Sequence, residues 1–124
     1  MDRVFQQSYH IPGTLAANAN IRFSAPFDMQ LVHVSAVGSN ANDATLTVGD
    51  SSDPDEYLTA FTIGDSNTPV VKDGDDFVDA DGATHARYYP HVAAGTVVVL
   101  TLDFDGDGGT AAADVTLVLT WTEG

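Results

Sequence analysis

Cysteine is missing from this chain of 124 residues, which excludes disulfide bonds and cysteine-based zinc sites. No apolar run approaches the roughly 18 residues of a membrane-spanning helix, so we expect no segment that crosses a bilayer. The N-terminal residues 1–6 lack a basic stretch followed by an apolar run, so we expect that the chain has no signal peptide. We therefore expect that it is synthesised in the cytoplasm. The length and the apolar content of 44% predict a single globular domain with its own core.

Sequence signatures of catalysis are also missing. The chain has no G-x-S-x-G nucleophile elbow, no glycine-rich phosphate loop and no thiol nucleophile. A pair of carboxylates for glycoside cleavage stays possible among so many aspartates, but no pair stands out from the rest. We therefore expect a protein that is not an enzyme.

Basic residues are scarce, because four Lys and Arg face eighteen Asp and Glu and give a net charge of −14. Such a surface repels phosphate, which argues against binding to nucleic acid or to anionic membranes. Sixteen of the eighteen acidic residues are Asp. Two explanations remain open: solvated loops that keep the protein soluble, and cation binding. Two acidic clusters, residues 50–56 and 73–81, fit the first explanation better, because each is a loop next to Gly or Pro.

Alternation of apolar and polar residues dominates the chain and predicts an all-β fold. The clearest strand covers Val115 to Trp121, and the segment from Thr96 to Phe104 follows the same pattern. The glycine-rich stretch between these two segments predicts a hairpin with a long loop. Eight or nine short strands at this spacing predict a single-domain β-sandwich, jelly-roll-like in topology. The other expected strands lie near residues 5–11, 21–27, 29–37, 44–48, 57–63, 70–71, 77–78 and 88–92.

The best candidate for a metal site is a calcium loop that begins at Asp103. Counted from that residue, carboxylates fall at positions 1, 3, 5 and 12 and a glycine, Gly108, at position 6, which is the spacing of an EF-hand loop. Strands rather than helices flank the loop, and Ala111 at position 9 offers no side-chain oxygen. The alternative is an ordinary polar turn, so we expect Ca²⁺ to be dispensable for folding. The four candidate ligands are Asp103, Asp105, Asp107 and Asp114.

An aromatic and locally basic segment stands out in this acidic chain. It consists of Arg87, Tyr88, Tyr89 and His91 around a proline, and Tyr and Arg are typical of protein interfaces. The segment is either a contact surface or a strand with one Tyr buried. Another histidine, His33, lies in a strand expected to be buried, where we expect a core residue rather than a ligand.

The chain resembles small virion proteins of tailed phages, which include capsid decoration, or cement, proteins. The resemblance covers residues 11–124 and is carried by the segments Gln30–Ala36, Asp43–Asp50, Ile63–Pro69 and Val115–Gly124. It implies a β-sandwich on the exterior of a phage capsid, synthesised in the host cytoplasm, that binds the major capsid protein and strengthens the shell. It also implies a homotrimer, with residues 1–15 as an N-terminal strand or arm and residues 16–124 as the sandwich domain.

A second hypothesis is a carbohydrate-binding β-sandwich module, with or without Ca²⁺. Its stacking platforms would be Tyr57, Tyr88, Tyr89 or Trp121. The alternation places Trp121 in the core with Leu117 and Leu119, which argues against its use as a platform.

Overall fold

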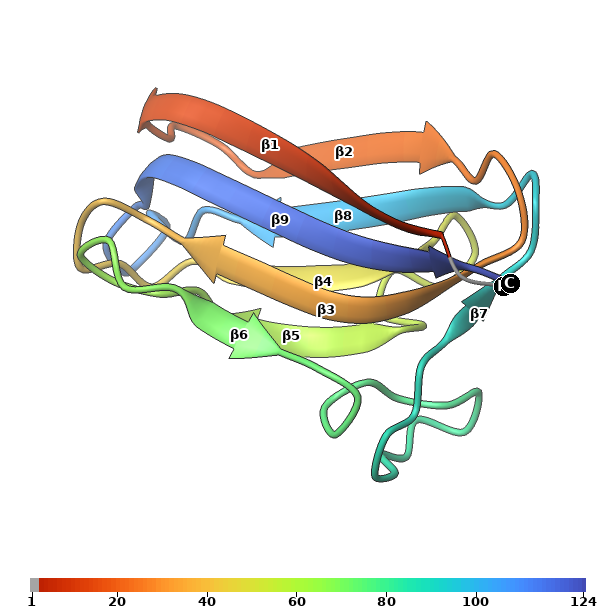
Figure 1. Cartoon of the computed structure of the whole chain (residues 1–124). Coiled ribbons are helices and arrows are strands. Elements are labelled where there is room, and N and C mark those ends of the chain that lie inside the picture. Colours follow the sequence, from red (N-terminus) through yellow and green to blue (C-terminus); the bar gives the residue numbers. More distant parts are fainter. Residues whose placement is uncertain (1–2) are drawn as a thin grey trace.

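The computed structural model describes residues 3–124, and the elements described are strands (Figure 1). The alternating sequence therefore folds as predicted, into an all-β domain. In chain order the strands are β1 (Val4–Thr14), β2 (Ala19–Ser24), β3 (Met29–Val37), β4 (Thr45–Asp50), β5 (Leu58–Thr62), β6 (Val70–Lys72), β7 (His91–Val92), β8 (Val97–Asp103) and β9 (Ala113–Glu123).

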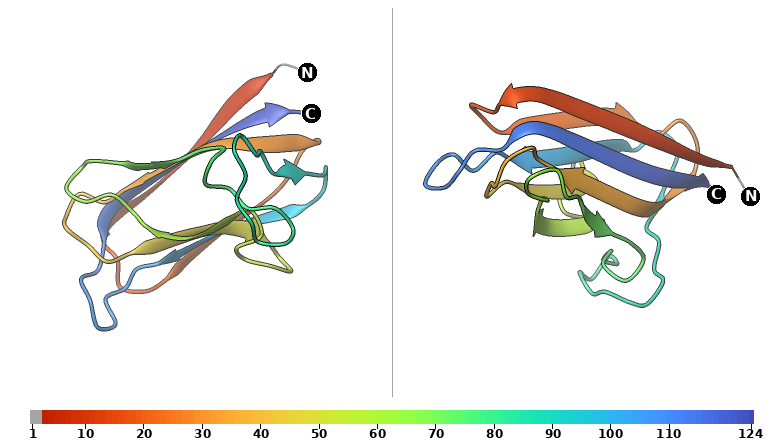
Figure 2. Two further views of the ribbon diagram at one scale, coloured as in Figure 1. Left: turned by 90° about the horizontal axis from the view of Figure 1, so that it is seen from below. Right: turned by 60° about the vertical axis from the view of Figure 1, so that its left-hand side comes forward.

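The strands form two antiparallel sheets that pack face to face (Figure 2). Sheet A has the order β1-β9-β3-β6, with β7 paired to the start of β3, and sheet B has the order β2-β8-β4-β5. The pairs are nested: β1 with β9, β2 with β8, β3 with β6 and β4 with β5. Successive pairs alternate between the two sheets, which is the winding of a jelly roll. The predicted single-domain β-sandwich of jelly-roll type is confirmed.

The core lies between the sheets and is built from the apolar half of each alternating strand. Val115, Leu117, Leu119 and Trp121 of β9 are completely buried, as the sequence predicted. Trp121 also connects three strands. Its indole ring meets Phe23 of β2 edge-to-face at 6.0 Å, and its Nε1–H donates to Oε1 of Gln7 in β1 at 2.8 Å. This one side chain therefore joins the two sheets and holds the first strand to the last.

The prediction that the last two long strands form a hairpin is wrong. β8 pairs with β2 and β4 in sheet B, whereas β9 pairs with β1 and β3 in sheet A. Residues 104–112 cross from one sheet to the other instead of turning back. Both strands bury one apolar face, but those two faces meet across the core and do not lie side by side in one sheet.

The weaker strand predictions have mixed outcomes. Residues 70–72 and 91–92 do form short strands, whereas Phe77 and Val78 contribute only an isolated bridge between Val78 and Thr84. His33 is half-exposed rather than a core residue, because a register irregularity between Leu31 and His33 turns it to the outer face of sheet A.

The N-terminal segment, predicted as a strand or an arm, contains β1, which pairs with β9 from Val4 opposite Thr122 to Thr14 opposite Ala113. Residues 1 and 2 of that segment lie outside the described residues. Within residues 3–124 there is no helix of the length and hydrophobicity needed to cross a membrane.

Candidate functional site

Most of the acidic side chains hold loops in shape. Eleven of the fifteen aspartates in residues 3–124 accept a hydrogen bond from a backbone N–H. Asp has the side-chain length for this contact, which explains why Asp so outnumbers Glu in these loops. The eleven are Asp28, Asp43, Asp50, Asp53, Asp65, Asp73, Asp75, Asp76, Asp79, Asp103 and Asp114.

The candidate calcium loop is spread over two sheets. Asp103 ends β8 in sheet B, and its Oδ1 accepts from the backbone N–H of Asp105 at 3.1 Å. Asp114 lies in β9 of sheet A and accepts from the N–H of Gly13 at 2.7 Å and from the hydroxyl of Ser39 at 3.1 Å. Asp107 is exposed in the bend between them. No three His, Asp or Glu side chains gather as a metal cage anywhere in residues 3–124, and Ca²⁺ binding by this loop stays a prediction.

The two carboxylate oxygens of Asp114 accept from different donors, Oδ1 from the Gly13 N–H and Oδ2 from the Ser39 hydroxyl. The Gly13 amide, the Ser39 hydroxyl and the nearby His10 all favour the charged form and lower the pKa of this carboxyl. The charged Asp114 side chain therefore holds the irregular end of β1, at Gly13, to Ser39 through hydrogen bonds.

The Arg87–His91 segment divides between core and surface. Tyr88 is half-buried against the core, while Tyr89 is 38% exposed and His91 is exposed in β7. Arg87 adopts a left-handed φ of 58°, and its N–H donates to Oδ1 of Asp75 at 3.2 Å. The role of the Arg87–His91 segment as a contact surface stays a prediction. A shallow hollow of about 220 Å³ beside it is lined by Asp73, Gly74, Asp75, Arg87 and Tyr89.

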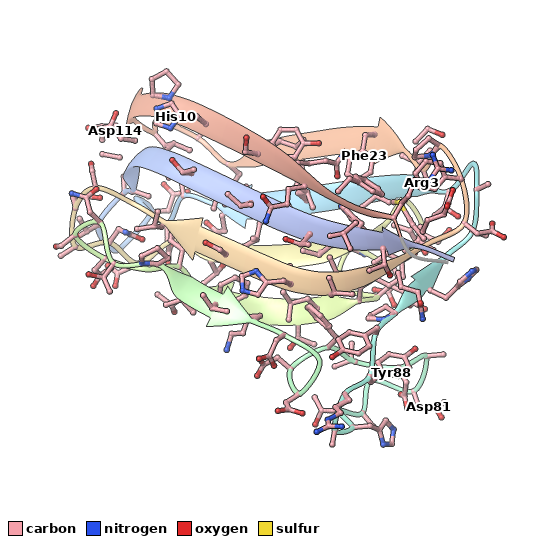
Figure 3. The ribbon with its side chains drawn as sticks, in the orientation of Figure 1. Arg3, His10, Phe23, Asp81, Tyr88 and Asp114 are labelled. Carbon is pink, nitrogen blue, oxygen red and sulfur yellow. The ribbon has the colours of Figure 1, made fainter. Side chains whose placement is uncertain are left out.

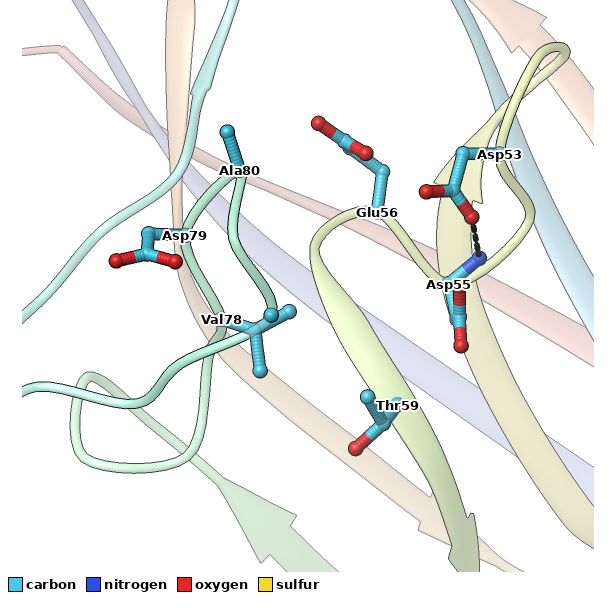
Figure 4. Close-up of a pocket in the computed structure, with 8 residues that line it drawn as sticks. Asp53, Asp55, Glu56, Thr59, Val78, Asp79 and Ala80 are labelled. Carbon is cyan, nitrogen blue, oxygen red and sulfur yellow. Dashed lines mark hydrogen bonds between the residues drawn. The ribbon is translucent and has the colours of Figure 1, made fainter.

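A smaller hollow, of about 80 Å³, lies between the acidic loops (Figure 4). A hydrogen bond between the side chains of Asp53 and Asp55 lowers the pKa of Asp53 and raises the pKa of Asp55. On the other wall, the backbone N–H of Ala83 and then the ring of His85, 2.7 Å away, lower the pKa of Asp79. Neither this hollow nor a third one of about 310 Å³, along β5 and the loop that follows β6, is a deep cleft of the kind that encloses small ligands.

The most distinctive surface carries no charge at all. Between Arg3 and Asn42 the chain has a single carboxylate, Asp28, whereas residues 43–124 hold sixteen of the eighteen acidic residues. The outer face of sheet A, here called the uncharged face, runs across β1, β9, β3 and β6 (Figure 3). Its outward-facing side chains are Val4, Gln6, Ser8, His10, Gln30, Val32, His33, Ser35, Val37, Val71, Thr116, Val118, Thr120 and Thr122.

The two carboxylates at the margins of this face, Glu123 and Asp114, already have hydrogen-bond partners. At one end Arg3 holds Glu123 with two hydrogen bonds, of 3.1 and 2.7 Å. At the other end lies Asp114, which is hydrogen-bonded to Gly13 and Ser39 and stands beside His10 (Figure 3). The strand pattern alone did not predict this surface, although the nearly acid-free stretch of residues 3–42 was a signal for it.

Comparisons with known proteins bear on the fold. No protein-family model matches the chain, and no curated protein matches it either. One solved structure with a similar fold is a chain of the cyanophage Pam1 capsid asymmetric unit, with a TM-score of 0.55 and 18% identity over 98% of this chain and 84% of that one. A structure described as "CBM4 structure and function" aligns with a TM-score of only 0.38 and 14% identity, over 94% of this chain and 82% of that one. The predicted resemblance to phage virion proteins is confirmed as a likeness of fold.

Proposed function

We propose that this chain is a non-enzymatic virion protein of the decoration, or cement, type, which binds the outer surface of a phage capsid through its uncharged face. The likeness of fold to a chain of the Pam1 capsid supports the association with a capsid. The partner on the shell is the major capsid protein.

The observation that carries this proposal is the uncharged face on a chain with a net charge of −14. Burying an unpaired carboxylate in an interface costs several kcal/mol, so a stable contact needs a surface free of such groups. The cores of protein interfaces are likewise depleted of charged residues. The outward-facing Thr, Val, Ser and Gln side chains of sheet A, exposed on β1 and half-buried on β3 and β9, meet this requirement over most of one side of the molecule.

The placement of the acidic loops is consistent with an exterior position. The loop of residues 73–81 lies on the side of the molecule away from β1 (Figure 1), and the loop of residues 50–56 follows β4 of sheet B, the sheet that does not carry the uncharged face. With the uncharged face against the shell, most carboxylates would remain in solvent. Such an acidic protein has no affinity for packaged DNA, which suits a position outside the shell.

The structure weakens the carbohydrate-binding hypothesis. Trp121 is completely buried and Tyr57 is 7% exposed, which removes two of its four stacking platforms. Tyr88 is half-buried, and Tyr89 alone presents a substantially exposed ring.

The test is binding to purified capsids by a pair of matched charge variants. Thr120 and Thr101 are both half-buried on the outer faces of strands that are paired on both sides, β9 in sheet A and β8 in sheet B. Each hydroxyl makes one side-chain hydrogen bond, Thr120 from Gln6 at 3.1 Å and Thr101 to Asn20 at 3.2 Å.

We expect Thr120→Glu to weaken capsid binding at least tenfold, since about 1.4 kcal/mol suffices for that change. Thr101→Glu should bind as the unsubstituted chain does. Equal binding by both variants would exclude the uncharged face as the contact, and failure of the unsubstituted chain to bind capsids or copurify with virions would contradict the proposed function.

A further inference from the structure

The outer edge of β1 is an unpaired strand edge. Among residues 3–124, only β9 pairs with β1. The N–H of Glu123 donates to the carbonyl of Arg3 at 2.8 Å, which identifies this pair as a hydrogen-bonded one. Hydrogen-bonded pairs alternate along an antiparallel ladder. The backbone N–H and C=O groups of Val4, Gln6, Ser8 and His10 therefore point away from β9, into solvent.

The other edges of the sandwich are protected in the ways that natural sheets use. β2 is short, carries Arg22 and is followed by Pro26. β5 is short and has a register irregularity opposite β4. β6 has three residues and includes Lys72. β1, by contrast, pairs without irregularity from Val4 to Ile11 and carries no Lys and no carboxylate in that stretch.

The charge distribution indicates which partner fits this edge. A basic partner would be attracted to the acidic loops, and the lack of carboxylates on β1 would bring it no advantage. A second copy of this chain is different, because it also carries a charge of −14. It approaches with least repulsion where both copies lack carboxylates, and pairing through β1 puts the two copies of the acidic loop of residues 73–81 at opposite ends (Figure 1).

We propose that two copies of the chain pair through the outer edges of β1, antiparallel and about a two-fold axis. The two A sheets then become one continuous sheet, and their uncharged faces become one larger face. Strand addition of this kind draws its affinity from main-chain hydrogen bonds. This inference goes beyond the proposed capsid role and does not depend on it, and it replaces the trimer that the resemblance implies with a dimer.

The first test removes a hydrogen bond of the edge without touching the ladder to β9. Proline at position 8 lacks the outward N–H, and its ring obstructs an incoming strand. Ser8→Ala is the matched control, because it loses the same hydroxyl and keeps the N–H.

Sedimentation over a concentration series should take the unsubstituted chain and Ser8→Ala from 13.0 kDa to twice that mass, while Ser8→Pro remains a monomer with unchanged circular dichroism. A Ser8→Pro variant that is folded and dimerises like the control would overturn the proposal, and so would an unsubstituted chain that is a monomer or a trimer throughout.

The second test needs no proline and therefore stands even if Ser8→Pro does not fold. Because the chain has no cysteine, Ser8→Cys and Asp81→Cys each provide a single site for a nitroxide spin label. Residue 8 should lie within about 10 Å of its symmetry mate, Cα to Cα, in a β1–β1 pair. Asp81 lies on the side away from β1 (Figure 3), so its two copies should be more than about 30 Å apart. The reverse order of the two distances, or two long distances in a dimer, would refute pairing through β1.

Discussion

Replacing Trp121 is the sharpest test of how the two sheets are held together. Its side chain is completely buried, so Trp121→Ala should cost about 3–5 kcal/mol of unfolding free energy. The edge-to-face contact with Phe23 accounts for about 0.5–1.5 kcal/mol of this loss. With an m-value of about 2 kcal/mol/M in urea, the unfolding midpoint should fall by about 2 M.

The hydrogen bond to Gln7 can be separated from the packing by a conservative pair of variants. Trp121→Phe keeps an aromatic ring but leaves Oε1 of Gln7 without its donor, which should cost about 1–3 kcal/mol. Adding Gln7→Leu removes the unmatched acceptor and should recover part of that loss.

Far-UV circular dichroism is the appropriate probe for these variants, because Trp121 is the chain's only tryptophan and fluorescence is lost with it. A loss below about 1.5 kcal/mol for Trp121→Ala would refute the reasoning, since losses that small do not arise from emptying a fully enclosed tryptophan site.

The remaining predictions concern titration, metal and secondary structure. The pKa of Asp79 is lowered from 3.8 in the folded chain. The charged Asp79 therefore stabilises the fold above about pH 3.8, and this stabilisation is lost as the pH falls through the lowered pKa. Asp79→Asn should flatten the acid side of a plot of melting temperature against pH. Burial raises the pKa of Tyr57 to about 12, so the folded state should lose stability between about pH 10 and 12, and absorbance titration should show this phenol ionising late. Melting in EDTA and in CaCl₂ at matched ionic strength should show folding without Ca²⁺, and any Ca²⁺-specific rise should disappear in Asp105→Ala; complete unfolding in EDTA would contradict this. Far-UV circular dichroism should show negligible helix.

The faces of the strands were predictable, but their neighbours were not. Alternation correctly showed the buried face of β9 and, in β8, the buried Val98, Leu100 and Leu102, but it did not show that Val99, on the other face of β8, is buried as well. It carries no information on the partner strand, since β8 and β9 have the same pattern whether they form a hairpin or face each other across a core. The nested pairing of a jelly roll joins residues more than 100 positions apart, such as Phe5 and Trp121, and no local signal specifies such pairs.

The acidic residues show the same division between local and distant information. Hydrogen bonds such as that from the N–H of Asp75 to Asp73 span two residues and follow from ordinary turn chemistry. Others connect distant segments, as when Asp43 accepts from Thr110 or Asp114 from Gly13. The sequence therefore left open whether its carboxylates serve loops or cations, and the structure shows that most of them serve loops.

The central claim, that the uncharged face is the assembly surface of a capsid-bound protein, is tested most directly by a cryo-electron microscopy reconstruction of capsids incubated with the chain. We expect density for the sandwich on the outer surface of the shell, with β1, β9 and β3 against the capsid and the loop of residues 73–90 toward solvent. Density in which that acidic loop contacts the shell while sheet A faces outward, or no added density at saturating concentration, would contradict it.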